Sequence, residues 1–278
     1  MEPKSSSRTR ISRDGKPKEK PNRLLAEERR REILGVVGEN GRITVEEVVR
    51  RFGVSAVTAR GDLDALSESG SLVRSHGGGI RPLTANPEHP LRVREGMHHD
   101  EKVRIAQAAA QLIRPLQTVI LCTGSTLAEL AAQIRRNCPE NITLITYALN
   151  VAAKLAELPN PSLIMLGGFF RPPSTAFVGP HAEQIMHSLH ADHCFMSTVG
   201  LDPDVGLTTL DIMEAQLNRR MIESASQVTV LADSSKFGHR SLSLISDFRP
   251  IHRVITDIGA PAAEVEKLRS RGVEVILA

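Results

Sequence analysis

The chain has 278 residues, of which 41% are apolar and 24% charged, so it can hold two domains with sizeable hydrophobic cores. No apolar run approaches the about 18 residues needed to span a membrane, and no apolar signal segment stands at the N-terminus, so neither membrane insertion nor export is expected. The three widely spaced cysteines, Cys122, Cys138 and Cys194, are typical of reduced thiols in a cytoplasmic protein.

The net charge of +3 is unevenly distributed. Residues 1–23 hold eight Lys or Arg and three Asp or Glu, whereas the rest of the chain has a net charge of −2. Residues 1–23 also lack aromatic side chains and helical periodicity, which predicts a disordered basic tail. Such a tail either attracts DNA phosphates nonspecifically or is simply a solvated extension.

A pair of short helices is predicted from Thr44 onward. Thr44 can cap the first helix, and Glu47 can close a capping box with it. Gly53 can take the left-handed conformation that ends this helix, and Ser55 is a suitable N-cap for the next. With an earlier apolar-faced helix over about 27–38, the pair predicts a three-helix cluster that contains a helix-turn-helix.

The second helix of the pair has two distinct sides. Its predicted buried side is formed by small and large apolar residues, namely Val54, Ala59, Leu63 and Leu66. A helix-turn-helix presents its other side to the DNA major groove. That side consists of Ala56, Val57, Thr58, Arg60 and Gly61.

A glycine-rich hairpin is predicted after these helices. Residues 71–74 and 80–82 have the pattern of two short strands, joined through residues 75–79. Such a hairpin is a wing, whose bare backbone can approach a phosphate closely. Because the segment is not basic overall, DNA binding depends on where its arginines lie: Arg42, Arg50, Arg51, Arg60, Arg74 and Arg81. The predicted DNA-binding residues are Thr44, Ser55, Ala56, Val57, Thr58, Arg60, Gly61, Arg74, His76, Gly77 and Gly78.

The remaining chain predicts an α/β domain. Residues 83–97, which include Pro87 and Pro90, have the composition of a linker. Beyond them, helices alternate with apolar strands, which predicts a mostly parallel sheet covered on both faces. The expected strands are 119–122, 142–146, 163–166, 194–199, 228–232, 253–256 and 273–277.

Polar or glycine-containing segments follow four of these strands. In parallel sheets, ligands bind beyond the carboxyl ends of the strands. Residues 123–126 open a helix whose N-terminus can hold a phosphate, although a plain capped turn has the same pattern. Asp233 can accept hydroxyl protons and Lys236 can hold a phosphate, although residues 233–236 also fit a polar loop. Together with the loops at 167–168 and 200–209, these segments predict an anion-binding pocket.

No metal or cofactor site is expected. Cys194 lies near His187, His190 and His193, but their spacing fits no zinc pattern. The predicted arrangement is a buried thiol among surface histidines.

Residues 24–82 resemble the winged helix-turn-helix of the DeoR family of bacterial transcriptional regulators. The family pattern Val-Ser-x-x-Thr-Ile-Arg-Arg-Asp-Leu stands here at residues 54–63, followed by Leu66 and Gly70 and by Arg-Ser-His-Gly-Gly-Gly at 74–79. Two residues depart from it. Ala59 replaces a large apolar residue, and Gly61 replaces an Arg, which removes a DNA contact and costs the helix roughly 1 kcal/mol relative to Ala.

Residues 98–278 resemble the sensor domain of the same family, which is related to ribose-5-phosphate isomerase and the coenzyme A transferases and binds phosphorylated sugars. The block at 232–237, Ala-Asp-Ser-Ser-Lys-Phe, is its most specific match. Leu116 and Tyr147 depart from the pattern, and Tyr147 bears on which effector binds. The resemblance implies an effector site made of Lys102, Gly124, Ser125, Thr126, Thr146, Tyr147, Gly167, Gly168, Gly200, Asp202, Thr208, Asp233 and Lys236.

The resemblance implies a DNA-binding transcriptional regulator without catalytic residues, a repressor of carbohydrate genes whose operator binding is controlled by a phosphorylated sugar. A dimer or tetramer is expected, because two half-sites add affinity and specificity. The alternative is a sugar-phosphate isomerase, with Asp233 or Glu214 as the base and Lys236 as the cation. An isomerase has no use for a winged helix. An architectural DNA-binding protein fits neither the neutral winged helix nor the large α/β domain.

Overall fold

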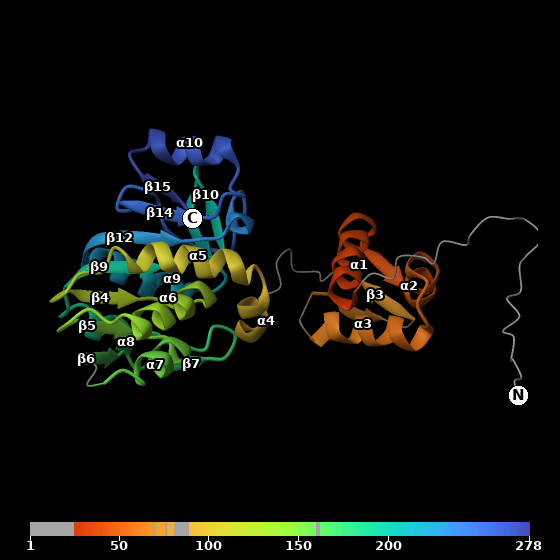
Figure 1. Ribbon diagram of the computed structural model, residues 1–278, viewed down its shortest axis with the longest axis horizontal. Helices are drawn as coiled ribbons and strands as arrows, with labels where there is room; N and C mark the ends of the chain where they lie inside the picture. Colours follow the sequence, from red (N-terminus) through yellow and green to blue (C-terminus); the bar gives the residue numbers. More distant parts are fainter. Residues whose placement is uncertain (1–24, 69–70, 76, 81–88, 160–161) are drawn as a thin grey trace, which may run out of the picture. The chain divides into compact units, whose positions relative to one another are not determined.

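The computed structural model describes residues 25–68, 71–75, 77–80, 89–159 and 162–278 (Figure 1). The chain divides into two compact units, 1–83 and 84–278. The predicted tail, His76, Arg81 and Pro82 lie outside the described residues. Among the residues that are described, no helix is long and apolar enough to cross a membrane.

The first unit is a winged helix whose caps are those predicted. The Oγ1 of Thr44 accepts a 3.1 Å hydrogen bond from the amide of Glu47, and the Glu47 carboxylate accepts one of 2.7 Å from the Thr44 amide. Gly53 ends the helix at φ 63°, and the Oγ of Ser55 accepts from the amide of Thr58. The helices are α1 (Ala26–Asn40), α2 (Val45–Phe52) and α3 (Ala56–Glu68), packed on a common apolar core.

The sheet of this unit differs from the prediction. It has three antiparallel strands in the order β1-β3-β2, with bounds Arg42–Thr44 (β1), Val73–Ser75 (β2) and Gly78–Ile80 (β3). The strand β1 was not predicted. Gly78 and Gly79 lie in the central strand rather than in a loop, because a Cβ on Gly78 would lie 2.2 Å from the carbonyl oxygen of Ile43 and one on Gly79 2.4 Å from the Leu72 side chain. The glycines therefore let the strands and the core pack closely.

The second unit contains the predicted parallel sheet. Seven parallel strands follow the order β15-β14-β12-β9-β4-β5-β6. Their bounds are Thr118–Leu121 (β4), Thr143–Thr146 (β5), Ser162–Met165 (β6), Ala191–Met196 (β9), Ala225–Leu231 (β12), Arg253–Thr256 (β14) and Glu274–Leu277 (β15). The β–α alternation thus predicted this sheet correctly.

Helices cover both faces of the sheet, as expected (Figure 1). Within β4, Val119 and Leu121 join the core beneath α5, α6 and α7, whereas Ile120 joins the opposite core with α8, α9 and α10. This alternation is what a strand buried on both faces requires. The bounds are His99–Ala110 (α5), Ser125–Arg136 (α6), Leu149–Leu155 (α7), Pro180–Met186 (α8), Ile212–Glu223 (α9) and Ala262–Ser270 (α10).

Several short elements were not predicted. A helix, α4 (Leu91–Gly96), lies inside the segment expected to be a linker. Residues 206–209, expected to form a loop, are the buried central strand of a second sheet in the order β10-β11-β13. The remaining bounds are Phe169–Arg171 (β7), Ala176–Val178 (β8), Gly200–Asp202 (β10), Gly206–Thr209 (β11) and Ser243–Ser246 (β13), and Ser234–Lys236 form a short 3-10 helix.

Candidate functional site

The recognition helix α3 leaves one side in solvent. Ala56, Val57, Thr58, Arg60 and Gly61 are all exposed, as predicted. Within the described residues, no carboxylate forms an ion pair with Arg60. This side of α3 is therefore free to contact another molecule, while Thr44 and Ser55 use their side chains as caps.

Asp62 fixes α3 to α1, a role that the sequence analysis missed. Its Oδ2 lies 2.5 Å from the Nε of Arg29, and its Oδ1 lies 3.0 Å from the Nε of Arg30. Asp62 lies three residues after the buried Ala59, on the side of the helix that faces the core. The helical period could therefore have placed this carboxylate among buried residues.

The wing is held by Arg74. Its Nε lies 2.8 Å from the Asp64 carboxylate, and its Nη1 donates a 2.7 Å hydrogen bond to the carbonyl of Gly78. Arg74 thus connects α3 to the hairpin. Gly77 is exposed with φ 84°, whereas Gly78, also predicted to contact DNA, is buried against β1.

A cavity of about 210 Å³ lies at the carboxyl ends of three adjacent strands, β4, β9 and β12. The chain order reverses at β4, which has β5 on one side and β9 on the other, and ligands of open α/β sheets bind at such a switch point. The volume far exceeds the about 10–15 Å³ that one water molecule needs. The strand ends contribute Gly124, Ser125, Thr126, Ser197, Thr198, Val199, Asp233, Ser235 and Lys236.

The other wall of the cavity comes from the region of α4. His89, Arg94, Met97 and His98 line it, together with Lys102 of α5. Sequence analysis missed His89, Arg94 and Met97 because it assigned residues 83–97 to a linker, and it also missed His98, the first residue of the predicted sensor domain. His239, three residues beyond Lys236, also lines the cavity and was missed.

Lys102 is the most deeply buried cation of the cavity, with 3% of its surface exposed. Its Nζ donates hydrogen bonds to the carbonyl oxygens of Arg94 and Met97, at the end of α4. Burial lowers the pKa of Lys102 to about 8, an effect that Asp233 opposes and Lys236 reinforces. Lys102 is therefore a cation whose charge an anionic ligand would stabilise.

Asp233 and the start of α6 offer complementary hydrogen-bonding groups. The Oδ1 of Asp233 accepts from the amide of Ser235 at 3.1 Å, while its buried Oδ2 has no hydrogen-bond partner among the described residues. Gly124 has no side chain to cap the helix, so the first amide N–H groups of α6 remain available as hydrogen-bond donors. A Cβ on Gly124 would lie 2.2 Å from the Oγ of Ser197, so a glycine is required there. The site can bind an anion at the helix N-terminus and a hydroxyl at Asp233.

Seven predicted effector residues do not line the cavity: Thr146, Tyr147, Gly167, Gly168, Gly200, Asp202 and Thr208. Thr146 is fully buried, and its Oγ1 accepts from the amide of Ala148. Tyr147 is also fully buried, and its hydroxyl donates to the Oδ1 of Asn218 at 2.7 Å. Gly167 and Gly168 follow β6, two strands from β4 and thus roughly 10 Å away across the sheet.

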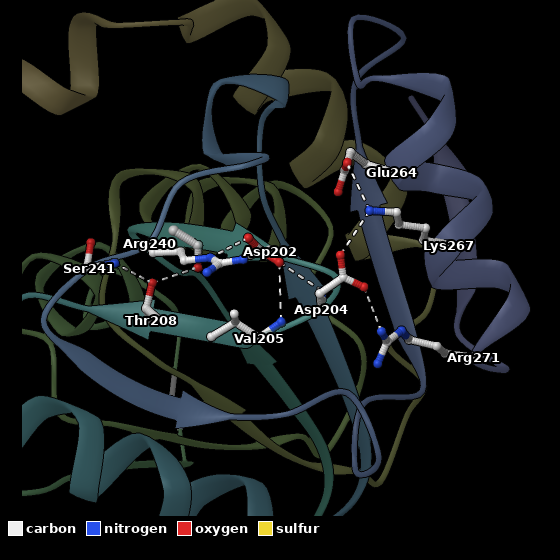
Figure 2. A network of polar contacts seen from close by, with 10 residues as sticks. Asp202, Asp204, Val205, Thr208, Arg240, Ser241, Glu264, Lys267 and Arg271 are labelled. Atoms are coloured by element: carbon white, nitrogen blue, oxygen red, sulfur yellow. Dashed lines mark hydrogen bonds and ion pairs between the residues drawn. The ribbon is translucent and has the colours of Figure 1, made fainter.

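Gly200, Asp202 and Thr208 contact residues 239–241, a segment in which His239 lines the cavity. Figure 2 shows Asp202 accepting a 2.6 Å bond from the Nε of Arg240, and Thr208 accepting one of 2.9 Å from the amide of Ser241. The bond from Arg240 lowers the pKa of Asp202. A Cβ on Gly200 would lie 2.4 Å from the carbonyl of His239. These residues therefore position the loop that carries His239.

The histidine next to Cys194 is not on the surface, contrary to the prediction. His193 is buried, and its Nε2 lies 2.8 Å from the Oγ1 of Thr229. Cys194 is buried with its Sγ 3.9 Å from that of Cys122. The described residues contain no group of three His, Cys, Asp or Glu side chains that could hold a metal ion.

A winged helix followed in the chain by an α/β unit with a cavity at its strand ends is the arrangement of a DNA-binding regulator that has a ligand-sensing domain. Residues 29–83 match the DeoR-like helix-turn-helix domain, and residues 97–258 match the DeoR C-terminal sensor domain. The chain belongs to the DeoR family of transcriptional regulators.

Named relatives match over nearly the whole chain. The "Putative aga operon transcriptional repressor" of Escherichia coli O157:H7 is 37% identical over 90% of this chain and 93% of its own length. The regulator UlaR of Shigella dysenteriae is 33% identical over 88% of this chain and 96% of its own length. Among solved structures, ribose 5-phosphate isomerase A of Methanocaldococcus jannaschii matches 50% of this chain and 54% of its own, with 19% identity and a TM-score of 0.36.

Proposed function

We propose that this regulator is a repressor of carbohydrate genes and that a phosphorylated sugar in the cavity controls its affinity for an operator. The observation that carries the proposal is the cavity itself, where the N-terminus of α6 faces Lys102, Lys236 and Asp233. Two relatives bear names that connect them with operons or regulation of transcription. Such an effector acts only through a difference between its affinities for two conformations of the protein.

The phosphate would bind at the start of α6. The free amides of its first turn and the hydroxyls of Ser125 and Thr126 are donors, and Lys236 adds a positive charge. The unpartnered Oδ2 of Asp233 would accept a proton from a sugar hydroxyl. The site is thereby matched to a ligand with an anionic end and a hydroxylated end.

On the DNA side, the exposed face of α3 would enter the major groove, with Arg60 as its longest donor. Gly77 would place bare backbone near a phosphate. A homo-oligomer would present two such helices to two half-sites. Since an operator lies in the bacterial cytoplasm, we place the protein there.

Calorimetry tests the effector site. Phosphorylated pentoses, hexoses and amino sugars are titrated beside their unphosphorylated forms. The expected result is that only a phosphorylated sugar binds, because a neutral hydroxyl cannot replace a dianion among charged donors. Lys236→Ala should weaken that binding, while Lys154→Ala, which lies outside the cavity, should not. Equal binding by Lys236→Ala and the parent would contradict the assignment.

The same cavity holds a carboxylate and two lysines, which is why catalysis is measured as well. Asp233 and Lys236 could serve isomerisation as base and cation. We propose that the protein binds its sugar phosphate without converting it. Turnover of any bound compound would favour the isomerase instead.

A further inference from the structure

A short turn carries Asp233 and Lys236 into the cavity. Its residues Ser234–Lys236 form a single turn of 3-10 helix shortly after β12. Backbone hydrogen bonds of 3.0 and 3.3 Å close it, the first from the amide of Lys236 to Asp233 and the second from the amide of Phe237 to Ser234. Hydrogen bonds of 3-10 helices have poor geometry, so such a short turn holds its shape only weakly by itself. The placement of Asp233 and Lys236 therefore depends on contacts made from outside the turn.

The end of the turn is anchored to a neighbouring strand. Phe237 is buried, and the amide of Gly238 donates a 2.9 Å hydrogen bond to the carbonyl of Leu201 in β10. These contacts fix the chain after Lys236. They leave the start of the turn, at Ser234, to be held in another way.

Asp257 holds the start of the turn, although it does not line the cavity. It follows β14, which is a parallel neighbour of β12 (Figure 1). Its Oδ1 accepts a 2.6 Å hydrogen bond from the amide of Ser234, and its Oδ2 accepts one of 2.9 Å from the amide of Gly259. Both oxygens of this carboxylate thus bind backbone amides, and a charged acceptor makes such bonds stronger than a neutral one does.

The carboxylate of Asp257 is enclosed by its partners. Only 3% of the surface of Asp257 is exposed, and burial of a charge is unfavourable unless hydrogen bonds compensate it. A Cβ on Gly259 would lie 2.8 Å from the Oδ2 of Asp257 and 3.0 Å from the Oγ of Ser234, so the three residues are closely packed. The carboxylate therefore has little freedom to move, and the Ser234 amide is held with it.

We propose that Asp257 is a positioning residue of the effector site, which holds the turn so that Asp233 and Lys236 keep their places in the cavity. Asp233 and Asp257 follow neighbouring parallel strands and accept the amides of successive residues, since the Oδ1 of Asp233 bonds to the amide of Ser235 at 3.1 Å. Preorganised binding groups raise affinity, because the ligand does not have to order them. The inference rests on the proposed function, because it assigns Asp257 a part in the affinity of the site for a phosphate.

Hydrogen exchange of the full chain, without any ligand, tests whether Asp257 holds the turn. In Asp257→Ala, exchange of the amides of residues 232–238 should become at least about 10-fold faster, the effect of losing one hydrogen bond to a charged group. Exchange in α7 should stay as in the parent, because a positioning role is confined to the turn. Unchanged exchange at residues 232–238 would overturn the proposal.

Asp247→Ala is the matched control. The Oδ1 of Asp247 also accepts a backbone amide, that of Arg249 at 3.0 Å, but Asp247 follows β13 and does not line the cavity. This variant should exchange at residues 232–238 like the parent. Gly259→Ala removes no charge and should act like Asp257→Ala, because its Cβ would displace the carboxylate. Faster exchange throughout the α/β unit in both Asp257→Ala and Gly259→Ala would assign Asp257 a general role in stability and refute the positioning role.

Calorimetry with inorganic phosphate tests whether the position of the turn sets the affinity of the site. The dissociation constant should rise at least about 10-fold in Asp257→Ala and stay as in the parent in Asp247→Ala. Asp257→Asn should lie between the two, because its Oδ1 can still accept from Ser234, whereas its Nδ2 cannot accept from Gly259. Equal affinity of the parent and a folded Asp257→Ala, or of the parent and Gly259→Ala if the first variant does not fold, would contradict the assignment.

The two tests separate this inference from the proposed function. A parent that does not bind phosphate would contradict the proposed function, and with it the part of Asp257 in binding. Hydrogen exchange at residues 232–238 would still decide whether Asp257 holds the turn.

Discussion

The carboxylate of Asp62 on α3 lies 2.5 Å from the guanidinium of Arg29 on α1, and both side chains are almost fully buried. This ion pair connects the recognition helix to α1 beside the apolar core that the two helices share. Such a pair contributes little when compared with an apolar replacement of both partners, but removing one partner leaves a buried charge uncompensated.

Asp62→Ala should therefore lower the free energy of unfolding of the winged helix by about 3–5 kcal/mol. The matched control is Asp64→Ala, because Asp64 pairs with Arg74 at a more exposed position, and pairs of that kind contribute about 1 kcal/mol or less. Thermal unfolding followed by circular dichroism compares the two. A similar decrease in the free energy of unfolding for both variants would show that the buried pair contributes no more to stability than the exposed pair.

Gly61→Arg should strengthen operator binding. Gly61 is exposed on α3 and nothing lies within 4 Å of a Cβ built there, so an Arg fits without strain. The change should also stabilise the helix by roughly 1 kcal/mol.

Arg60→Ala should weaken operator binding, by about 1–3 kcal/mol if Arg60 reads a base. DNA titrations at fixed salt measure both, and weaker binding by Gly61→Arg would mean that the Arg blocks a contact.

Burial makes the stability of the α/β unit sensitive to mild acid through His193. Burial, together with Arg253 and His252, lowers the pKa of His193 from 6.5 to about 4. Between these values the unfolded chain binds more protons, so the free energy of unfolding should fall, by up to about 3 kcal/mol, as the pH drops from 6.5 to 4. Denaturant unfolding of the parent and of His193→Gln checks this. A His193→Gln profile as steep as the parent's would disprove the assignment.

Lys102 should couple effector binding to proton uptake. Its pKa of about 8 means that it is partly neutral at pH 8, and a bound dianion would raise this pKa. Affinity for a sugar phosphate should then fall as the pH rises from 7 to 9. Calorimetry in two buffers of different ionisation enthalpy measures the protons taken up at pH 8. Uptake should disappear in Lys102→Gln, and its persistence there would assign the proton to another group.

The parallel sheet could be predicted because its five inner strands, β4, β5, β9, β12 and β14, are apolar runs with buried residues on both faces. The β10-β11-β13 sheet could not, because its strands begin with Gly200, Gly206 and Ser243 and none of them is a continuous apolar run. The run at 206–209 begins with Gly206, where a Cβ would lie 2.2 Å from the carbonyl oxygen of Ser246. Close packing therefore requires a glycine at this position, and a strand that begins with a glycine resembles a loop in sequence.

The candidate site was predicted where it depends on neighbouring strands and missed where it depends on distant parts of the chain. Ser125 and Lys236 follow strands separated only by β9, and they share the cavity. Tyr147 also follows a strand, but it is fully buried, its hydroxyl bonds to Asn218, and it does not line the cavity. Arg94 reaches the cavity through a helix in a segment with the composition of a linker.

The central claim is that a ligand in the cavity controls DNA binding by the winged helix, and operator titrations with and without a sugar phosphate test it most directly. The parent's operator affinity should change when the sugar phosphate that binds in calorimetry is added. Lys236→Ala should bind the operator as tightly as the parent without the ligand, and it should no longer respond to it. An operator affinity of the parent that stays the same at saturating ligand would contradict the account.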